Sequence, residues 1–298
     1  MQRGEPWRLA AGVGLAAALA FPALAADHKY ILPEAARSAP AGQRALEVEI
    51  PQAELSSNIN PSMVDVAMGG GVLGVIIDAK IDNDRAKRAQ AGITPVRDAI
   101  SDFDADQLGL DTTQALAARV TWLQGAAAPG FGRDTSPWGR GKVLDAHAAN
   151  AGQVVFLQYT YDTSPDFASI RVGLTITVAN TAAAAGAKPD SRLSNRNLVY
   201  IQTVTSVVSL SDPKGAQDNA ARWAAGKGSL ARRALTLGFQ DVAVLAARAA
   251  DLKEADLAAL TLGQRRSLAG VSGRLVEEGP NGTLLFNNGF AHVQVLHD

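Results

Sequence analysis

The sequence contains no cysteine, few aromatic residues and almost no excess of charge. The absence of cysteine excludes zinc fingers, iron–sulfur clusters, thiol catalysis and disulfide scaffolds. The 28 Lys and Arg residues are balanced by 29 Asp and Glu residues, whereas a nucleic-acid-binding protein needs a clustered basic excess to neutralise phosphates. We therefore predict no nucleic-acid partner. A hydrophobic fraction of 47% over 298 residues indicates a globular chain.

The first 25 residues form a predicted signal peptide. Arg3 and Arg8 provide a basic start, residues 9–21 form an uncharged apolar run, and residues 23–25 (Ala-Leu-Ala) provide an Ala-x-Ala cleavage site. The apolar run is shorter than the ~20 residues that span a bilayer, although an uncleaved anchor helix is the alternative. We expect Sec-type export, cleavage near Ala25, and a periplasmic or secreted mature protein.

The mature chain would carry a net charge of −2, because cleavage removes two arginines and one glutamate. No cysteine follows the cleavage site, so a lipid anchor on a new N-terminal cysteine is excluded. At about 270 residues, the chain is long enough to bury a core without disulfides. Breaks in composition divide it into an extended arm (residues 26–44), an α+β domain (residues 45–262) and a C-terminal β meander (residues 271–298).

Hydrophobic periodicity predicts the elements of the main domain. Alternation of apolar with other residues favours strands, and apolar residues at three- and four-residue steps favour helices. The predicted strands cover residues 46–50, 154–161, 170–178 and 198–210. The predicted helices cover residues 79–103 with a kink at Pro95, and residues 112–123, 143–149, 216–225, 230–249 and 255–262. Residues 125–141 are rich in glycine and proline and are expected to form a loop.

The order of these elements favours an α+β fold or an α/β sandwich. Hairpin connections make most of the strand pairs antiparallel. In the tail, two Asn-Gly pairs separate three β-prone runs, at residues 274–278, 283–286 and 290–296. We therefore expect a mainly antiparallel sheet packed with helices, followed by a small three-stranded meander.

The segment from Gly69 to Gly74 formally matches the pattern G-x-G-x-x-G of dinucleotide-binding sites. Such a site also needs a second strand followed by an acidic residue, and here a charged helical run follows instead. An exported protein also meets no pool of nicotinamide nucleotides. We therefore predict no nucleotide and no other cofactor.

Two interpretations stay open for this glycine-rich segment. It is either a tight turn that leads into a buried helix, or a face of small residues that packs against a partner, a second copy or a membrane surface. In the second case the interaction surface would consist of Gly69, Gly70, Gly71, Gly74, Val75 and Ile76.

Asp102, Asp104 and Asp106 alternate as in the first half of a calcium-binding loop. The following residues do not continue the pattern, since Gln107 stands where the loop needs glycine and Thr113 where it needs glutamate. The alternative is that these carboxylates favour the start of a helix. We assign no metal ligand.

No catalytic constellation is recognisable in the sequence. The four histidines lack the spacing of a helical metal pair, and residues 270–273 (Gly-Val-Ser-Gly) are one residue short of the serine-hydrolase motif. The doublets Arg232-Arg233 and Arg265-Arg266 are interpreted as solvated helix faces. Because no rule selects a pair among the many acidic residues, the catalytic residues stay unknown.

The signal peptide and two stretches, GGGVLGVIIDAKIDNDRAKRAQAGITPVRDAI and VVFLQYTYDTSPDFASIRVGLTITV, resemble an uncharacterised group of proteobacterial exported proteins. The resemblance extends over residues 45–250 and implies an envelope location, but no activity. We expect a non-enzymatic binding or assembly protein of the envelope. The alternative is a periplasmic hydrolase that uses Asp or Glu residues in a cleft between the sheet and residues 125–141.

Overall fold

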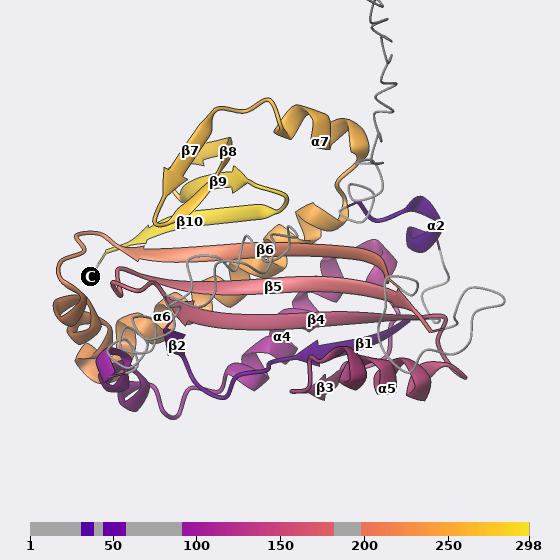
Figure 1. Cartoon of the computed structure of the whole chain (residues 1–298), viewed down its shortest axis with the longest axis horizontal. Helices are drawn as coiled ribbons and strands as arrows, with labels where there is room; N and C mark the ends of the chain where they lie inside the picture. Colours follow the sequence, from indigo (N-terminus) through magenta and orange to yellow (C-terminus); the bar gives the residue numbers. More distant parts are fainter. Residues whose placement is uncertain (1–30, 39–43, 58–90, 182–197, 298) are drawn as a thin grey trace, which may run out of the picture.

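The computed structural model describes residues 31–38, 44–57, 91–181 and 198–297. Its centre is a mixed sheet with the strand order β3-β1-β4-β5-β6-β10-β9-β8-β7, and β2 pairs beside β4 (Figure 1). The first strands are β1 (Arg44–Glu49), β2 (Ser56–Ser57), β3 (Gly130–Gly132), β4 (Gln153–Thr163), β5 (Ser169–Asn180) and β6 (Leu198–Leu210). The tail contributes β7 (Arg265–Leu268), β8 (Val271–Gly279), β9 (Gly282–Phe286) and β10 (Phe290–Leu296).

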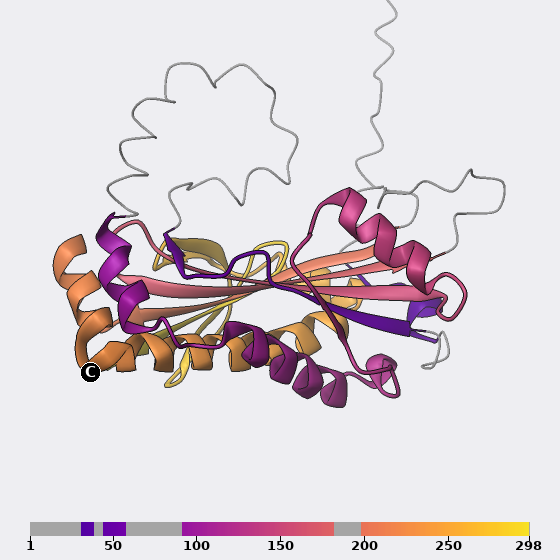
Figure 2. The same cartoon turned by 90° about the horizontal axis from the view of Figure 1, so that it is seen from below.

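Helices cover both faces of the sheet unequally. The long helix α6 and the shorter α4 lie on one face, and α5 lies on the other (Figure 2). The helices are α2 (Glu34–Arg37), α4 (Ala105–Arg119), η3 (Thr121–Leu123), α5 (Pro137–His147), α6 (Ala216–Ala250) and α7 (Glu254–Leu260), and residues 91–99 are also helical. The expected α+β fold is confirmed.

The three long strands β4, β5 and β6 form the antiparallel centre of the sheet. Alternation places the side chains of Leu157, Ile176 and Val204 on the face below α6, where all three are buried. Phe239 of α6 stacks on Tyr159 of β4, with ring centroids 5.5 Å apart. The apolar period that predicted these strands therefore marks the face on which α6 packs.

Helix α6 is interrupted where the sequence predicts a break between two helices. Gly226, Lys227 and Gly228 have φ values of 58°, 58° and 69°, in the left-handed region. Gly228 also allows a close approach of another segment, since a Cβ atom there would lie 2.5 Å from Cγ2 of Ile100. The break lets the second half of α6 run along the sheet while its first half turns away.

The largest differences from the expectation concern the start of α4 and residues 125–141. Helix α4 begins at Ala105 instead of residue 112, because Asp104 accepts a hydrogen bond from the Gln107 N–H and caps the helix. Residues 125–141, expected to form a loop, include β3 and the first turn of α5, which was predicted to begin at residue 143. Ser136 caps α5 and Pro137 occupies its first turn, a combination that starts helices.

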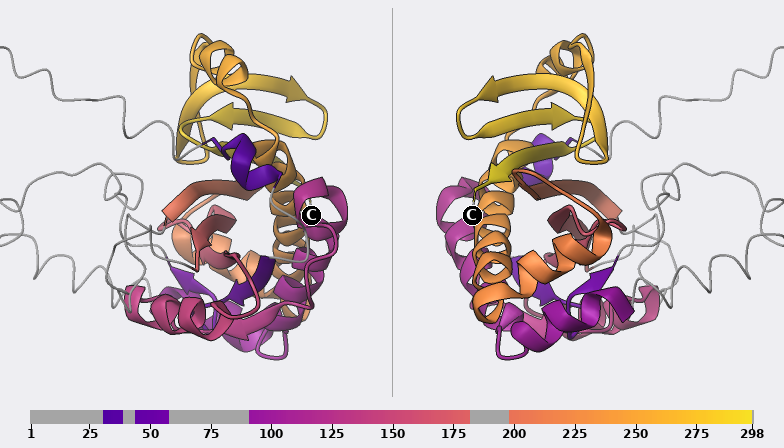
Figure 3. Two further views of the ribbon diagram at one scale, coloured as in Figure 1. Left: turned by 90° about the vertical axis from the view of Figure 1, so that its right-hand side faces the viewer. Right: turned by 90° about the vertical axis from the view of Figure 1, so that its left-hand side faces the viewer.

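The C-terminal strands continue the main sheet. Strand β10 pairs in parallel with β6, from Ala291 opposite Thr205 to Leu296 opposite Leu210, and the other tail strands extend the sheet beyond it (Figure 3). The tail also contains a fourth strand, β7, that the periodicity did not predict. None of the helices in the described ranges is long and apolar enough to cross a membrane.

An ion pair between His292 and Asp241 holds the tail against α6. Nδ1 of His292 lies 2.9 Å from a carboxylate oxygen of Asp241, and both side chains are mostly buried. The hydrogen bond to Asp241 raises the pKa of His292, burial opposes this, and Glu277 and the backbone at Asn281 add to the rise. A second ion pair between α6 and the tail joins Arg248 to Glu277 of β8.

We expect this pair to stabilise the fold most under mildly acidic conditions. Because the pKa of His292 is raised in the folded state, its contribution is full below the ordinary histidine pKa and is lost as pH rises through the raised value. Denaturant titrations from pH 5 to pH 9 should show the largest stability loss for His292→Gln at the acidic end. A loss that grows with pH would contradict this assignment, and Asp241→Asn serves as the matching variant.

Candidate functional site

The six predicted interaction residues from Gly69 to Ile76 lie outside the described residues. The described segments before and after them, residues 44–57 and 91–181, are in contact. Nε of Arg97 donates a hydrogen bond to the Leu55 carbonyl at 2.6 Å. A cavity of about 260 Å³ lies at this junction, with Phe103 and Tyr161 in its lining. Burial raises the pKa of the Tyr161 phenol to about 12. The charged groups of this lining are Glu54, Arg97 and Asp98.

The three alternating aspartates do not converge on one point. Asp102 pairs with Arg232, Asp104 caps α4, and Asp106 lies 2.5 Å from Arg133. The hydrogen bond from Arg232 is the main cause that lowers the pKa of Asp102. No group of three or more potential ligands that could hold a metal ion occurs in the part of the chain the structure describes. The helix-start interpretation fits Asp104, which caps α4, and Asp106 in its first turn, whereas Asp102 pairs with an arginine of α6.

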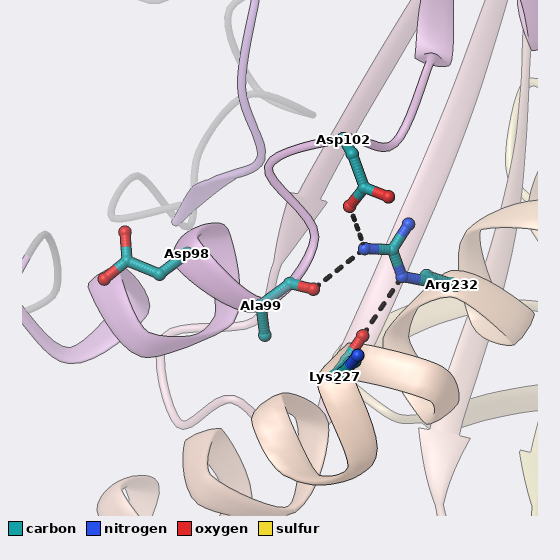
Figure 4. Close-up of a pocket in the computed structure, with 5 residues that line it drawn as sticks. All are labelled: Asp98, Ala99, Asp102, Lys227 and Arg232. Atoms are coloured by element: carbon teal, nitrogen blue, oxygen red, sulfur yellow. Dashed lines mark hydrogen bonds and ion pairs between the residues drawn. The ribbon is translucent and has the colours of Figure 1, made fainter.

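A second cavity, of about 530 Å³, lies beside the break in α6 (Figure 4). Its lining consists of Asp98, Ala99, Asp102, Lys227 and Arg232. Figure 4 shows the Arg232 guanidinium directed at three acceptors, which are the Lys227 and Ala99 carbonyls and the Asp102 carboxylate.

These contacts indicate a structural role for Arg232. The Ala99 carbonyl ends the helix of residues 91–99 and would otherwise lack a partner within that helix. Arg232 donates to it at 2.9 Å and so joins this helix end to α6. Because Asp102 neutralises the guanidinium, the cavity offers little net charge to a bound ion.

A third cluster of charged side chains lies between β1 and α5. Glu49 is bound by Nε and Nη2 of Arg140 at 3.0 and 2.5 Å, and the two side chains are only 4% and 10% exposed. Arg140 also donates to Gln158 at 2.8 Å. Two turns further along α5, His147 lies 2.8 Å from Glu47.

This cluster lies between the sheet and the 125–141 region, where the hydrolase alternative needs its carboxylates. Glu47 and Glu49 both lie there, yet each one has its own basic partner, His147 and Arg140 respectively. Neither of the two cavities described above is lined by these residues. The arrangement fits an internal ionic connection between β1 and α5 better than a substrate site.

The positions of the charged residues in the sequence are a feature of this cluster that the apolar periodicity does not reveal. Glu47 and Glu49 are two residues apart on one strand and share a face. Arg140 and His147 are seven residues apart on one helix and also share a face. Two acids on one face of a strand and two basic residues on one face of a nearby helix are compatible with contacts between the two elements, but their spacings along the elements differ, about 6.6 Å against about 10.5 Å, and do not assign the pairs.

Each of the two end strands of the sheet carries an exposed apolar side chain. Six large apolar residues of the described chain are exposed, of which two lie in the end strands, Phe131 in β3 and Leu268 in β7. The others are Leu262 shortly before β7, Trp138 in α5, Val244 in α6 and Val295 in β10. Both strands pair with a single neighbour among the described strands. The sheet therefore ends on both sides in a strand edge accompanied by apolar side chains.

No protein-family model, no curated protein and no solved structure matches this chain.

Proposed function

We propose that the protein is an exported component of the cell envelope that binds or assembles with other envelope components, without catalysing a reaction. The location in the proposal rests on the N-terminal export pattern of residues 1–25, and the binding role rests on the surface of the folded domain. It assigns binding to the two end strands of the sheet, β3 and β7, with the segment from Gly69 to Ile76 as a further contact.

The observation that carries the proposal is the position of the exposed apolar side chains. A strand edge offers unpaired backbone donors and acceptors, and neighbouring apolar or aromatic side chains add contact area to an interface. The ionic clusters of the domain support the non-catalytic part of the proposal. Glu49, Asp102 and Asp106 each pair with an arginine that joins two elements.

Capture of envelope proteins by the immobilised mature chain tests the proposed role. Phe131→Ser and Leu268→Ser are each expected to lower the amount of the captured partner about fivefold, the effect of ~1 kcal/mol of binding free energy. Val244→Ser is the matched control, because Val244 is 47% exposed on α6, away from both end strands. Equal capture by all four proteins would contradict the proposal.

The export step has its own test. The protein recovered from cells is expected in the periplasmic or secreted fraction, with Ala26 as its first residue. Recovery from the cytoplasm with residues 1–25 still attached would contradict export.

A further inference from the structure

Strand β7 ends the sheet with its backbone directed outward. The Leu275 N–H donates to the Gln264 carbonyl at 2.8 Å, and the register continues with Arg265 opposite Arg274 and Ser267 opposite Ser272. In an antiparallel pair, bonded and non-bonded positions alternate. Arg265 and Ser267 therefore direct their N–H and C=O groups away from β8, and all four residues of β7 are exposed.

Like charges gather at this edge. The doublet Arg265-Arg266 lies on a strand and not on the helix face expected from the sequence. Arg265 and Arg274 form a non-bonded pair, in which the two side chains lie closest, and like charges at such positions are unfavourable. Arg274 donates to the Gly263 carbonyl. No carboxylate in the described ranges forms an ion pair with any of the three arginines.

We propose that β7 accepts an extended acidic segment of a partner protein as an additional strand. The inference rests on the proposed binding role and names the partner's chemistry. The unpaired backbone groups of Arg265 and Ser267 would bind the segment, and its carboxylates would neutralise the arginines. A second copy of β7 does not fit, because it would bring the arginines of two chains together.

The register specifies the partner's pattern. For an antiparallel segment, the residue opposite Arg265 and the one before it, opposite Arg266, would be acidic. The residue opposite Leu268 comes two positions earlier still and would be apolar. In chain order the pattern is apolar, any residue, acidic, acidic, which the peptide acetyl-Thr-Val-Thr-Glu-Glu-Thr-amide contains.

Fluorescence anisotropy of this labelled peptide with the full mature protein tests the inference. Ser267→Pro removes an outward N–H that makes no bond within the sheet, and proline is tolerated on edge strands. We expect it to weaken binding about fivefold or more. Ser267→Ala is the matched control and should bind like the wild type, because both substitutions remove the same hydroxyl, which Ser272 contacts.

The role of charge is tested separately. Arg265→Gln should weaken binding about threefold, in line with a surface ion pair, and should reduce the dependence on salt. A peptide with Lys-Lys in place of Glu-Glu should not bind. Equal binding by Ser267→Pro and Ser267→Ala, equal binding of both peptides, or no binding to the wild type would overturn the inference. The capture experiment on Phe131 and Leu268 is scored independently of these outcomes.

Discussion

Replacing Arg140 with methionine is expected to lower the free energy of unfolding by about 3–5 kcal/mol. The substitution leaves the Glu49 carboxylate buried without its partner, and removes the arginine that also bonds Gln158 and lies 5.2 Å above the Phe156 ring. Denaturant titration of the mature protein measures the loss. A large effect here means that Glu49 and Arg140 serve the fold.

The double substitution Glu49→Leu and Arg140→Met provides the control for this result. When both charges are removed together, no unpaired carboxylate stays in the interior, and at least half of the lost stability should return. Glu54→Gln removes the carboxylate of an ion pair whose acid is 69% exposed and should cost less than ~1 kcal/mol. A cost below ~1 kcal/mol for Arg140→Met would contradict the structural role and leave Glu49 available for chemistry.

Gly228→Ala is the second substitution with a large expected effect, a loss of about 2–4 kcal/mol in the free energy of unfolding. An alanine there must keep a left-handed backbone, and its Cβ would lie 2.5 Å from Cγ2 of Ile100 and 3.1 Å from the Ala99 carbonyl oxygen. Relief of these contacts would move the end of the helix of residues 91–99 away from α6.

Gly226→Ala separates the two causes. Its φ of 58° is similar, but the nearest atom to an added Cβ is the Ser229 hydroxyl at 3.1 Å, which a change of rotamer can move. We expect a loss of about 1–2 kcal/mol, from the left-handed backbone alone. Equal losses for both variants would show that the contact between α6 and Ile100 contributes nothing.

The sequence predicted the elements whose apolar period is strong. Strand β6 matches its prediction at both ends, and the break in α6 at Ala225–Gly228 lies where the predicted helices 216–225 and 230–249 meet. These elements are long and pack one face on a common core, so local pattern and tertiary burial agree.

The elements that the sequence missed lack such a period. Strand β7 is exposed on all four residues, so no burial pattern distinguishes it from a polar loop. Strand β3 has only three residues and exists because β1 pairs with it. The parallel pairing of β10 with β6 joins segments far apart in the chain, and nothing in the tail's own sequence indicates it.

The candidate site residues likewise divide into those that local sequence pattern indicates and those that depend on contacts between distant segments. A role at the start of a helix was the alternative interpretation for Asp102, Asp104 and Asp106 together, and Asp104 is the one that caps α4. By contrast, the pairing of Glu49 with Arg140 depends on contacts across 91 residues of sequence, which periodicity cannot supply. The residues from Gly69 to Ile76 lie outside the described chain, and their role as an interaction surface stays a prediction.

Photo-crosslinking in intact cells tests the central proposal most directly. A photoreactive amino acid is placed in turn at Phe131 of β3, at Leu268 of β7 and at Val244 of α6, all of which are exposed in the folded chain. Binding through the end strands predicts crosslinks to other envelope proteins from positions 131 and 268 and none above background from position 244. Crosslinks that are absent at both end strands, or equally strong at all three positions, would contradict it.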